Sequence, residues 1–259
     1  MTTGHLISVV TVCFNSAKTI RDALESVSNQ TEANFEHIIV DGNSTDGTQE
    51  IVKNFLYHTN RFVSEPDNSI YDAMNKGISL AKGEIIGFLN SDDIFADNMV
   101  LSRVIDAFDD PKTEVCFGDI LYITKDKNRV VRHWKSKEFT KGSFYKGWCP
   151  AHPTFYVRRS ALNRLGGFDL RYHLAADVEF MLRYLECNSL KSVYIPTIQV
   201  FMRVGGATNK NLTNIMRQNI EIFNALNLSG ERYSKIIFLL NKIQDRCLQR
   251  INGALYKQK

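Results

Sequence analysis

The chain has 259 residues, of which 44% are apolar and 23% are charged, and it contains 15 glycines and 5 prolines. These proportions are typical of a soluble globular protein and exclude collagen-like, low-complexity and broadly disordered classes. The length fits one large domain, or one domain with an appendage, whose core needs no disulfide or metal to fold.

The net charge of +4 is concentrated at the C-terminal end. Residues 231–259 hold seven lysines and arginines against two acids, so they contribute +5 and the rest of the chain −1. Nucleic-acid binding normally needs a basic face on the main body of a domain. We therefore expect no nucleic-acid partner.

Membrane spans, leaders and cysteine sites have characteristic patterns that this sequence lacks. Its longest apolar runs are about five residues, whereas a span needs roughly 20. No cationic start precedes the first apolar stretch, so we expect no signal peptide. The five cysteines include no CxxC pair, which argues against zinc and disulfide sites and for a reducing, cytoplasmic location.

Strand and helix patterns alternate along the first half of the chain. Runs of apolar and β-branched residues predict strands at residues 7–12, 35–41, 61–65 and 83–89. Apolar residues at helical spacing predict helices at residues 20–27, 51–55 and 69–81. Ser16 is the expected N-cap of the first helix. This alternation predicts an α/β fold with a mostly parallel sheet flanked by helices.

The second half follows a different pattern. Strand-like stretches lie at residues 113–124, 129–134, 153–159 and 191–203, and helical ones at 177–186, 212–226 and 233–251. Residues 135–148 are polar, basic and aromatic without a clear period, so we expect a mobile loop. We expect two parts, a domain at residues 1–208 and a C-terminal helical extension at residues 209–259.

Three predicted strands end in polar segments. These segments are Cys13 to Asn15, Asp41, and Asn90 to Asp93. Because ligands bind beyond the carboxyl ends of strands in open parallel sheets, we expect them to lie side by side and form a site. Asp41 has two interpretations, an acceptor for a base or ribose and a turn-forming residue before Gly42.

Asp92 and Asp93 are adjacent carboxylates, which are unfavourable at a strand end unless a cation lies between them. They indicate a divalent metal, Mg²⁺ or Mn²⁺, with phosphate oxygens and water completing its shell. The alternative is that both acids cap a helix starting near Ile94. Spacing alone favours neither interpretation.

Five segments, in this order and spacing, resemble the glycosyltransferases of family 2, which have the GT-A fold. They are VVTVCFN, IIVDGNSTDGT, SEPDNSIYDAMNKGI, AKGEIIGFLNSDD and HPTFYVRR. The resemblance covers roughly residues 7–206 and is of the kind found in bacterial enzymes of O-antigen, capsule and exopolysaccharide assembly. It implies inverting transfer of a sugar from a nucleotide-diphosphate donor, with a divalent metal on the diphosphate.

The resemblance implies roles for residues that bind the donor. Thr11, Val12 and Phe14 would line the nucleoside pocket, and Asp41 would bind the base, in the first place uracil. The residues near the donor phosphates or ribose would be Tyr71, Asn75 and Lys76. The family's Asp-X-Asp signature falls on Asn90, Ser91 and Asp92, so the first carboxylate is missing. Asp92 then takes the metal-binding position beside Asp93.

The resemblance also makes Asp177, in LAADVEFMLR, the candidate catalytic base. It would take the proton from an acceptor hydroxyl as that oxygen attacks the anomeric carbon. Ala176 replaces the family's usual Glu. From residue type alone, an acid in a first helical turn also suits the helix dipole. Glu179 is a second candidate, although it should face elsewhere.

The acceptor is implied to be a lipid-linked or growing surface polysaccharide. Trp148 and His152 would contact it, because an aromatic face suits a sugar ring. The alternative for His152 is a histidine of the core. The segment Gly166 to Asp169 resembles the GGFD turn before the catalytic helix, and Gly205 with Gly206 resembles a late turn near the diphosphate.

The last helical pattern carries an apolar stripe beside basic residues. The stripe consists of Ile236, Ile237, Leu240, Ile243, Cys247 and Ile251. A basic amphipathic helix can lie on an anionic membrane, here the inner face of the cytoplasmic membrane. The alternative is a helix packed on its own domain or at a dimer interface.

A second function is compatible with the same sequence, that of a non-catalytic GT-A-like binding subunit in a polysaccharide assembly complex. Asn90 and Ala176 favour it because they depart from the enzymes' pattern. Asp41, Asp92 and Asp177 argue against it because a scaffold has no need for acids at those points.

Overall fold

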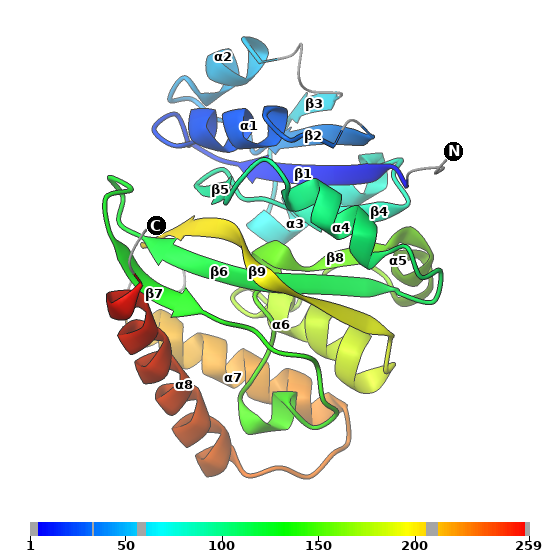
Figure 1. Cartoon of the computed structure of the whole chain (residues 1–259), viewed down its shortest axis with the longest axis vertical. Coiled ribbons are helices and arrows are strands. Elements are labelled where there is room, and N and C mark those ends of the chain that lie inside the picture. Colours follow the sequence, from blue (N-terminus) through cyan, green and yellow to red (C-terminus); the bar gives the residue numbers. More distant parts are fainter. Residues whose placement is uncertain (1–4, 33, 56–60, 206–211, 257–259) are drawn as a thin grey trace.

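The computed structural model describes residues 5–32, 34–55, 61–205 and 212–256. These residues form one nine-stranded sheet with helices on both faces (Figure 1). The strand order is β3-β2-β1-β4-β8-β6-β9-β5, and β7 pairs with β6. The proposed domain boundary at 208–209, and Gly206, lie outside the described residues.

The first half alternates strands and helices as predicted. Its elements are β1 (Ile7–Cys13), α1 (Ile20–Ser28), β2 (Phe35–Asp41), α2 (Thr48–Lys53), β3 (Arg61–Ser64), α3 (Ile70–Leu80) and β4 (Ile85–Phe88). β1 pairs in parallel with β2 and β4, and β2 with β3. The expected cap of α1 is wrong, because Thr19 holds the N-cap position and the Ser16 hydroxyl contacts Ser91 instead.

The second half adds strands of both directions. Its strands are β5 (Asp93–Phe95), β6 (Val115–Ile123), β7 (Val130–Trp134), β8 (Tyr156–Arg158) and β9 (Ser192–Arg203). Its helices are α4 (Val100–Ala107), α5 (Arg159–Leu165), α6 (Ala176–Met181), α7 (Leu212–Leu228) and α8 (Lys235–Leu255). Short helical turns lie at η2 (Phe144–Lys146), η3 (His152–Thr154) and η4 (Leu182–Cys187), the last a π-helical continuation of α6.

The sheet is mixed but mostly parallel, in agreement with the prediction. β6 and β9 run parallel to one another and, through β8, in the same direction as β1 to β4. β5, β7 and β8 are antiparallel to their neighbours. The chain therefore has the predicted α/β architecture, with the C-terminal helices α7 and α8 at one end of the molecule (Figure 1).

β1 is buried on both faces, which explains its continuous apolar sequence. Ile7 and Val9 face a core shared with α1 and α4, whereas Val10 and Val12 face a core shared with α3 and α6. Helix α3 approaches β1 closely at Gly77, where an added Cβ would lie only 2.2 Å from a methyl carbon of Val10. This close packing fixes α3, which carries three of the predicted donor-site residues.

Residues 135–148, expected to form a mobile loop, pack against the domain. Phe144 is buried in the core on the α3 and α6 side. The backbone amides of Gly142 and Phe144 donate to the carboxylate of Glu186, which is also buried. Aromatic residues that gave this segment no helical or strand period are its anchors in the core.

His37 makes stability sensitive to acid. Its ring is buried in β2, its Nε2 lies 2.9 Å from the Thr11 hydroxyl, and burial lowers its pKa to about 3. Between pH 6.5 and that value the unfolded chain binds a proton that the folded protein does not, so stability decreases as pH falls. We expect His37 to account for a loss of about 2 kcal/mol between pH 7 and pH 5.

Urea unfolding at the two pH values measures this loss. His37→Gln should show a smaller decrease in unfolding free energy between pH 7 and pH 5 than the wild type. His173→Gln is the control, because that side chain is exposed and its change should leave the slope as it was. An unchanged slope in His37→Gln would show that the loss comes from other groups.

Candidate active site

The three polar strand ends lie side by side, as the strand pattern predicts. Cys13 and Asp41 are register partners at the ends of β1 and β2. The backbone amide of Asn15 donates to the Ser44 hydroxyl at 2.8 Å, and the Ser16 and Ser91 hydroxyls lie 2.8 Å apart. The loops after β1, β2 and β4 therefore form one connected polar edge of the sheet.

Asp41 holds this edge together. Its carboxylate is buried and accepts hydrogen bonds from the Ser44 amide (2.9 Å), the Ser44 hydroxyl (2.5 Å), the Ser64 hydroxyl (2.6 Å) and the Cys13 thiol (3.5 Å). Burial, followed by the charge of Asp41, raises the pKa of Cys13, so this cysteine is a neutral thiol. The turn-forming interpretation of Asp41 therefore describes its contacts.

The other predicted nucleoside residues differ in exposure. Thr11 and Val12 are buried in β1, and the Thr11 hydroxyl is taken up by His37. Phe14, by contrast, is 63% exposed and lies against Gly42, where an added Cβ would be 3.3 Å from its ring. Of these three residues, Phe14 alone has an exposed side chain.

Asp67 lies beside Gly42, as Phe14 does, and is not one of the predicted site residues. A Cβ on Gly42 would lie 2.5 Å from an Asp67 carboxylate oxygen, so Gly42 leaves room for that acid. Burial raises the pKa of Asp67, with the nearby Lys76 charge opposing the shift. The sequence signal for Asp67 is its place in the segment SEPDNSIYDAMNKGI, which also contains the predicted residues Tyr71, Asn75 and Lys76.

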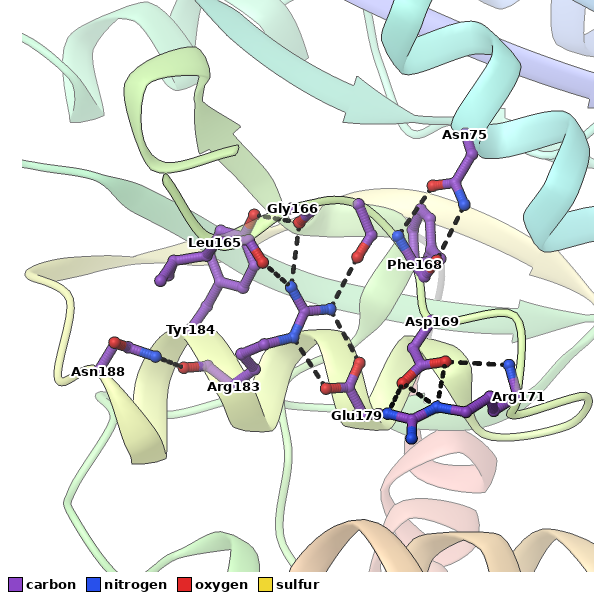
Figure 2. Close-up of polar contacts among 11 residues, drawn as sticks. Asn75, Leu165, Gly166, Phe168, Asp169, Arg171, Glu179, Arg183, Tyr184 and Asn188 are labelled. Atoms are coloured by element: carbon purple, nitrogen blue, oxygen red, sulfur yellow. Dashed lines mark hydrogen bonds and ion pairs between the residues drawn. The ribbon is translucent and has the colours of Figure 1, made fainter. Parts of the chain in front are cut away.

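The three predicted residues on α3 make different contacts. Lys76 Nζ donates to the Pro66 carbonyl at 2.7 Å and pairs with Glu65 at 2.9 Å, so it fixes the loop that carries Asp67. Asn75 points the other way and clamps the backbone of Phe168, with bonds of 2.9 and 2.8 Å (Figure 2). Tyr71 reaches toward the second half of the chain.

Asp92 and Asp93 do not cap a helix. Asp93 opens the short strand β5, and the next helix, α4, begins at Val100. Asp93 is fully buried, and burial, followed by the charge of Asp92, raises its pKa well above the ordinary value. Burial also raises the pKa of Asp92. The helix-cap interpretation is therefore wrong.

Two buried oxygens beside these acids fit a cation. Asp93 Oδ1 and Asn90 Oδ1 are buried and have no hydrogen-bond partner within the part of the chain that the structure describes. No group of three His, Cys, Asp or Glu among the described residues could hold a metal alone. An ion here would need further oxygen ligands, as Mg²⁺ and Mn²⁺ take from phosphates.

Arg203 of β9 supports the same segment. Its guanidinium donates to the Asp92 carbonyl at 2.8 Å and pairs with Asp22 of α1. Its charge lowers the pKa of both Asp92 and Asp93, against the larger effect of burial. Arg203 therefore fixes the backbone at Asp92 and offsets part of the local negative charge.

Asp177, the candidate base, lies in the first turn of α6 and contacts α3. The Tyr71 hydroxyl donates to Asp177 Oδ1 at 3.2 Å. Burial and the Asp177 charge raise the pKa of Tyr71, so the phenol stays protonated and donates. Burial raises the pKa of Tyr122 of β6, the charge of Arg132 opposes that shift, and the charges of Asp93 and Asp177 add to it.

A network around Arg183 fixes the turn before Asp177 (Figure 2). The guanidinium donates to the carbonyls of Leu165, Gly166 and Gly167. Glu179 holds it from the other side at 2.8 and 2.9 Å. Glu179 is therefore committed to Arg183, in line with the expectation that it faces away from Asp177. Nothing in the sequence pattern marked Arg183.

The two predicted acceptor residues lie in aromatic surroundings. His152 is buried, stacks on Phe88 with ring centroids 5.7 Å apart and meets the edge of Phe168. Burial lowers its pKa, and its Nε2 has no hydrogen-bond partner in the described part of the protein. Trp148 is half-buried, packs edge-on against Phe117, and has Lys137 Nζ over its ring.

Comparisons with known proteins give sequence relatives across most of the chain. The model for "Glycosyl transferase family 2" matches residues 8–166. An uncharacterised glycosyltransferase of Mycobacterium tuberculosis is 32% identical over 187 residues, which are 71% of this chain and 70% of that protein. A PGL/p-HBAD biosynthesis glycosyltransferase of Mycobacterium bovis BCG is 28% identical over 210 residues, 79% of each chain.

Solved structures share the fold. S. aureus TarS 1–349 in complex with UDP-GlcNAc gives a TM-score of 0.67 at 17% identity, over 98% of this chain and 76% of that one. Mannosyltransferase PcManGT from Pyrobaculum calidifontis, in complex with GDP-Man and Mn²⁺, gives 0.64 at 17% identity, over 100% and 77%. With the family model matching more than half of its residues, this chain belongs to glycosyl transferase family 2, as a nucleotide-sugar glycosyltransferase with the GT-A fold.

Proposed function

We propose that this enzyme transfers a sugar, with inversion, from a UDP-sugar to a lipid-linked or growing surface polysaccharide. The observation that carries the proposal is the hydrogen bond from Tyr71 to Asp177. This bond joins α3, which lies beside the polar edge of the sheet, to an acid at the start of α6. A site with a donor end and a base end is what a direct displacement requires.

In the proposed reaction Asp177 is the general base. Tyr71 occupies Oδ1, which leaves Oδ2 to take the proton of the acceptor hydroxyl. The acceptor oxygen attacks the anomeric carbon as the bond from that carbon to the diphosphate breaks on the opposite face. The configuration inverts in one step, so the reaction needs no covalent nucleophile. Trp148 and His152 are the proposed acceptor side of the site.

The donor end is proposed to lie along the polar strand edge. Phe14 offers an exposed ring for stacking on the base, with Thr11 and Val12 in the wall behind it. Asp41 fixes the loop beneath the nucleoside, and the neighbouring Asp67 is the acid with room to contact it. Lys76 holds the loop of Asp67, and Asn75 holds the turn that leads to Asp177.

Asp92, Asp93 and the amide oxygen of Asn90 would hold Mn²⁺ or Mg²⁺ together with oxygens of the diphosphate. When bound, the ion neutralises charge that develops on the leaving diphosphate. The support is the pair of buried, unpartnered oxygens on Asn90 and Asp93. Arg203 supports Asp92 through its carbonyl, which leaves the carboxylate available.

The alternative of a non-catalytic binding subunit has less support. It rests on Asn90 and Ala176, which depart from the family pattern. A scaffold would gain nothing from burying Asp93, because a carboxylate oxygen buried without a hydrogen-bond partner, as Oδ1 is among the described residues, destabilises the fold. It would also not need a tyrosine aimed at Asp177.

Calorimetric titration with UDP, GDP and dTDP, each with Mn²⁺ and with EDTA, tests the donor proposal. We expect UDP to bind, and Mn²⁺ to lower its Kd by about tenfold or more, which corresponds to about 1.4 kcal/mol. Metal-dependent binding of GDP in place of UDP would overturn the nucleotide assignment. Failure of all three to bind the folded protein would favour the non-catalytic alternative.

A further inference from the structure

Helix α8 turns its apolar stripe away from the protein. Six aliphatic side chains of α8 are more than half exposed, namely Ile236 (72%), Ile237 (55%), Leu240 (61%), Ile243 (59%), Ile251 (55%) and Leu255 (74%). Cys247 is exposed on the same stretch. An amphipathic helix of a globular protein normally buries this stripe and exposes its polar face, so α8 has the opposite arrangement.

The polar side of α8 contacts the domain instead. Lys242 Nζ donates to the Asn219 side chain of α7 at 2.7 Å, and Gln249 accepts from Arg132 of β7 at 2.5 Å. The backbone also packs closely, since an added Cβ on Gly253 would lie 2.6 Å from the Arg132 backbone. The expectation that α8 packs on its own domain is thus met by these polar side chains, by Gly253 and by the buried Phe238, which leaves the apolar stripe exposed.

Helix α7 lies at the same end of the molecule as α8 (Figure 1) and also exposes apolar side chains. It packs beside α8 through Phe223 and Phe238, whose ring centroids are 5.3 Å apart. Met216 and Ile220, one turn apart on α7, are also more than half exposed. The exposed aliphatic stripe on α8 is itself larger than the single apolar residues that protein surfaces normally show, and such a patch marks an interaction site.

The charge of α8 indicates which kind of partner its exposed stripe binds. Residues 235–255 contain Lys235, Lys242, Arg246 and Arg250 against Asp245, a balance of +3. Lys235 and Arg250 are exposed. Two copies meeting through this helix would bring like charges together, whereas anionic lipid headgroups complement them. Within the described residues, no helix is both long and apolar enough to cross a bilayer.

We propose that α8 binds an anionic lipid surface, lying in its plane with Ile236, Leu240, Ile243, Cys247, Ile251 and Leu255 in the boundary between headgroups and acyl chains. The helix combines this exposed apolar stripe with the exposed basic residues Lys235 and Arg250, as interfacial helices do. This inference does not depend on the proposed function, because it concerns a surface that the site does not use. It would bring a lipid-linked acceptor to the enzyme.

The start of α6, which carries Asp177, is held by the helix that packs on α8. The backbone amides of Leu174 and Ala175, just before α6, donate to the Glu221 carboxylate of α7 at 2.7 and 3.0 Å. Helix α7 in turn contacts α8 through Phe223 and Phe238. A lipid surface bound by α8 would therefore lie toward the base end of the site.

Flotation with vesicles tests the proposal on the full chain. We expect the wild type to float with phosphatidylcholine vesicles that contain phosphatidylglycerol, and to stay in solution with phosphatidylcholine alone. Leu240→Glu combined with Ile243→Glu should abolish flotation. Met99→Glu is the matched control, because Met99 is also exposed but lies at the start of α4. Lys235→Gln and Arg250→Gln should each weaken binding about fivefold.

The two exposed cysteines provide a second measurement that needs no charged substitution. An environment-sensitive fluorophore on Cys247, in a Cys187→Ser background, should shift to the blue on anionic vesicles. The same label on Cys187, in a Cys247→Ser background, should not shift, because Cys187 lies at the end of η4. Equal shifts at both positions, or none at Cys247, would overturn the assignment.

Sedimentation separates lipid from a second copy of the chain. A wild type that is monomeric without lipid and floats with anionic vesicles supports the proposal. A wild-type dimer that the Leu240→Glu and Ile243→Glu substitutions dissociate, together with no flotation, would make α8 a dimer interface and overturn it. Nucleotide binding measured on the same samples would be unaffected in either case, which distinguishes this failure from a failure of the proposed function.

Discussion

Asp177→Asn should lower kcat by a factor of about 10²–10⁴ while the Kd for UDP stays nearly unchanged. The proposed base takes the proton of the acceptor hydroxyl, and an amide cannot. Asparagine keeps the size of the side chain and an oxygen for the Tyr71 hydroxyl, so α6 should stay in place. The loss should therefore fall on the chemical step and leave the binding of the donor intact.

Glu179→Gln is the matched control for this prediction. Glu179 lies two residues along the same helix and is also a carboxylate, but both of its oxygens bind Arg183. The amide keeps one acceptor for the guanidinium, so we expect reduced stability and a kcat within about tenfold of the wild type. The measurement is the initial rate of sugar transfer, with UDP affinity followed by calorimetry. A near-native rate in Asp177→Asn, with a large loss in Glu179→Gln, would exchange the two roles.

The sheet and the strand edge follow from local sequence patterns. Apolar, β-branched runs identify β1, β2 and β4, and the polar residues that follow each run identify the edge where ligands bind. Local patterns cannot reveal which partner a polar residue finds. The carboxylate of Asp41 accepts hydrogen bonds from Ser44 and Ser64. The side chain of Asn75 donates to the backbone of Phe168, ninety-three positions away in sequence. These contacts depend on strand order, which periodicity does not encode.

Two further differences have specific physical causes. Asp92 and Asp93 precede a helix in sequence, so a cap was a reasonable interpretation, but Asp93 pairs with Met202 of β9 and starts a strand. That pairing partner lies more than a hundred residues away. The sequence shows the apolar stripe on α8 but does not show that the stripe faces away from the domain, because an apolar face is normally buried. Contacts of Lys242 and Gln249 with distant residues decide that the polar face turns inward.

Asp92→Asn should remove most of the effect of Mn²⁺ on UDP binding and lower kcat/KM by about 10²-fold. The substitution takes away one negative charge but keeps the backbone carbonyl that Arg203 holds. Local structure should therefore persist, and the loss should concern the cation. In EDTA the variant and the wild type should bind UDP with similar Kd values, because the Phe14 end of the site is unchanged.

Asp97→Asn is the control, since Asp97 follows on the same segment but is exposed and paired with Arg103 at 2.8 Å. It should bind UDP as the wild type does, with and without Mn²⁺. Asp93 explains why Asp92→Asn should keep a small part of the effect of Mn²⁺ on UDP binding and yet lower turnover strongly. In Asp92→Asn the buried oxygens of Asp93 and Asn90 can still contact a cation. Less of the negative charge that develops on the leaving diphosphate is then neutralised, so turnover falls. If Mn²⁺ improved UDP binding equally in Asp92→Asn and wild type, the metal would have to lie elsewhere, and the unpartnered oxygens of Asn90 and Asp93 would need another explanation.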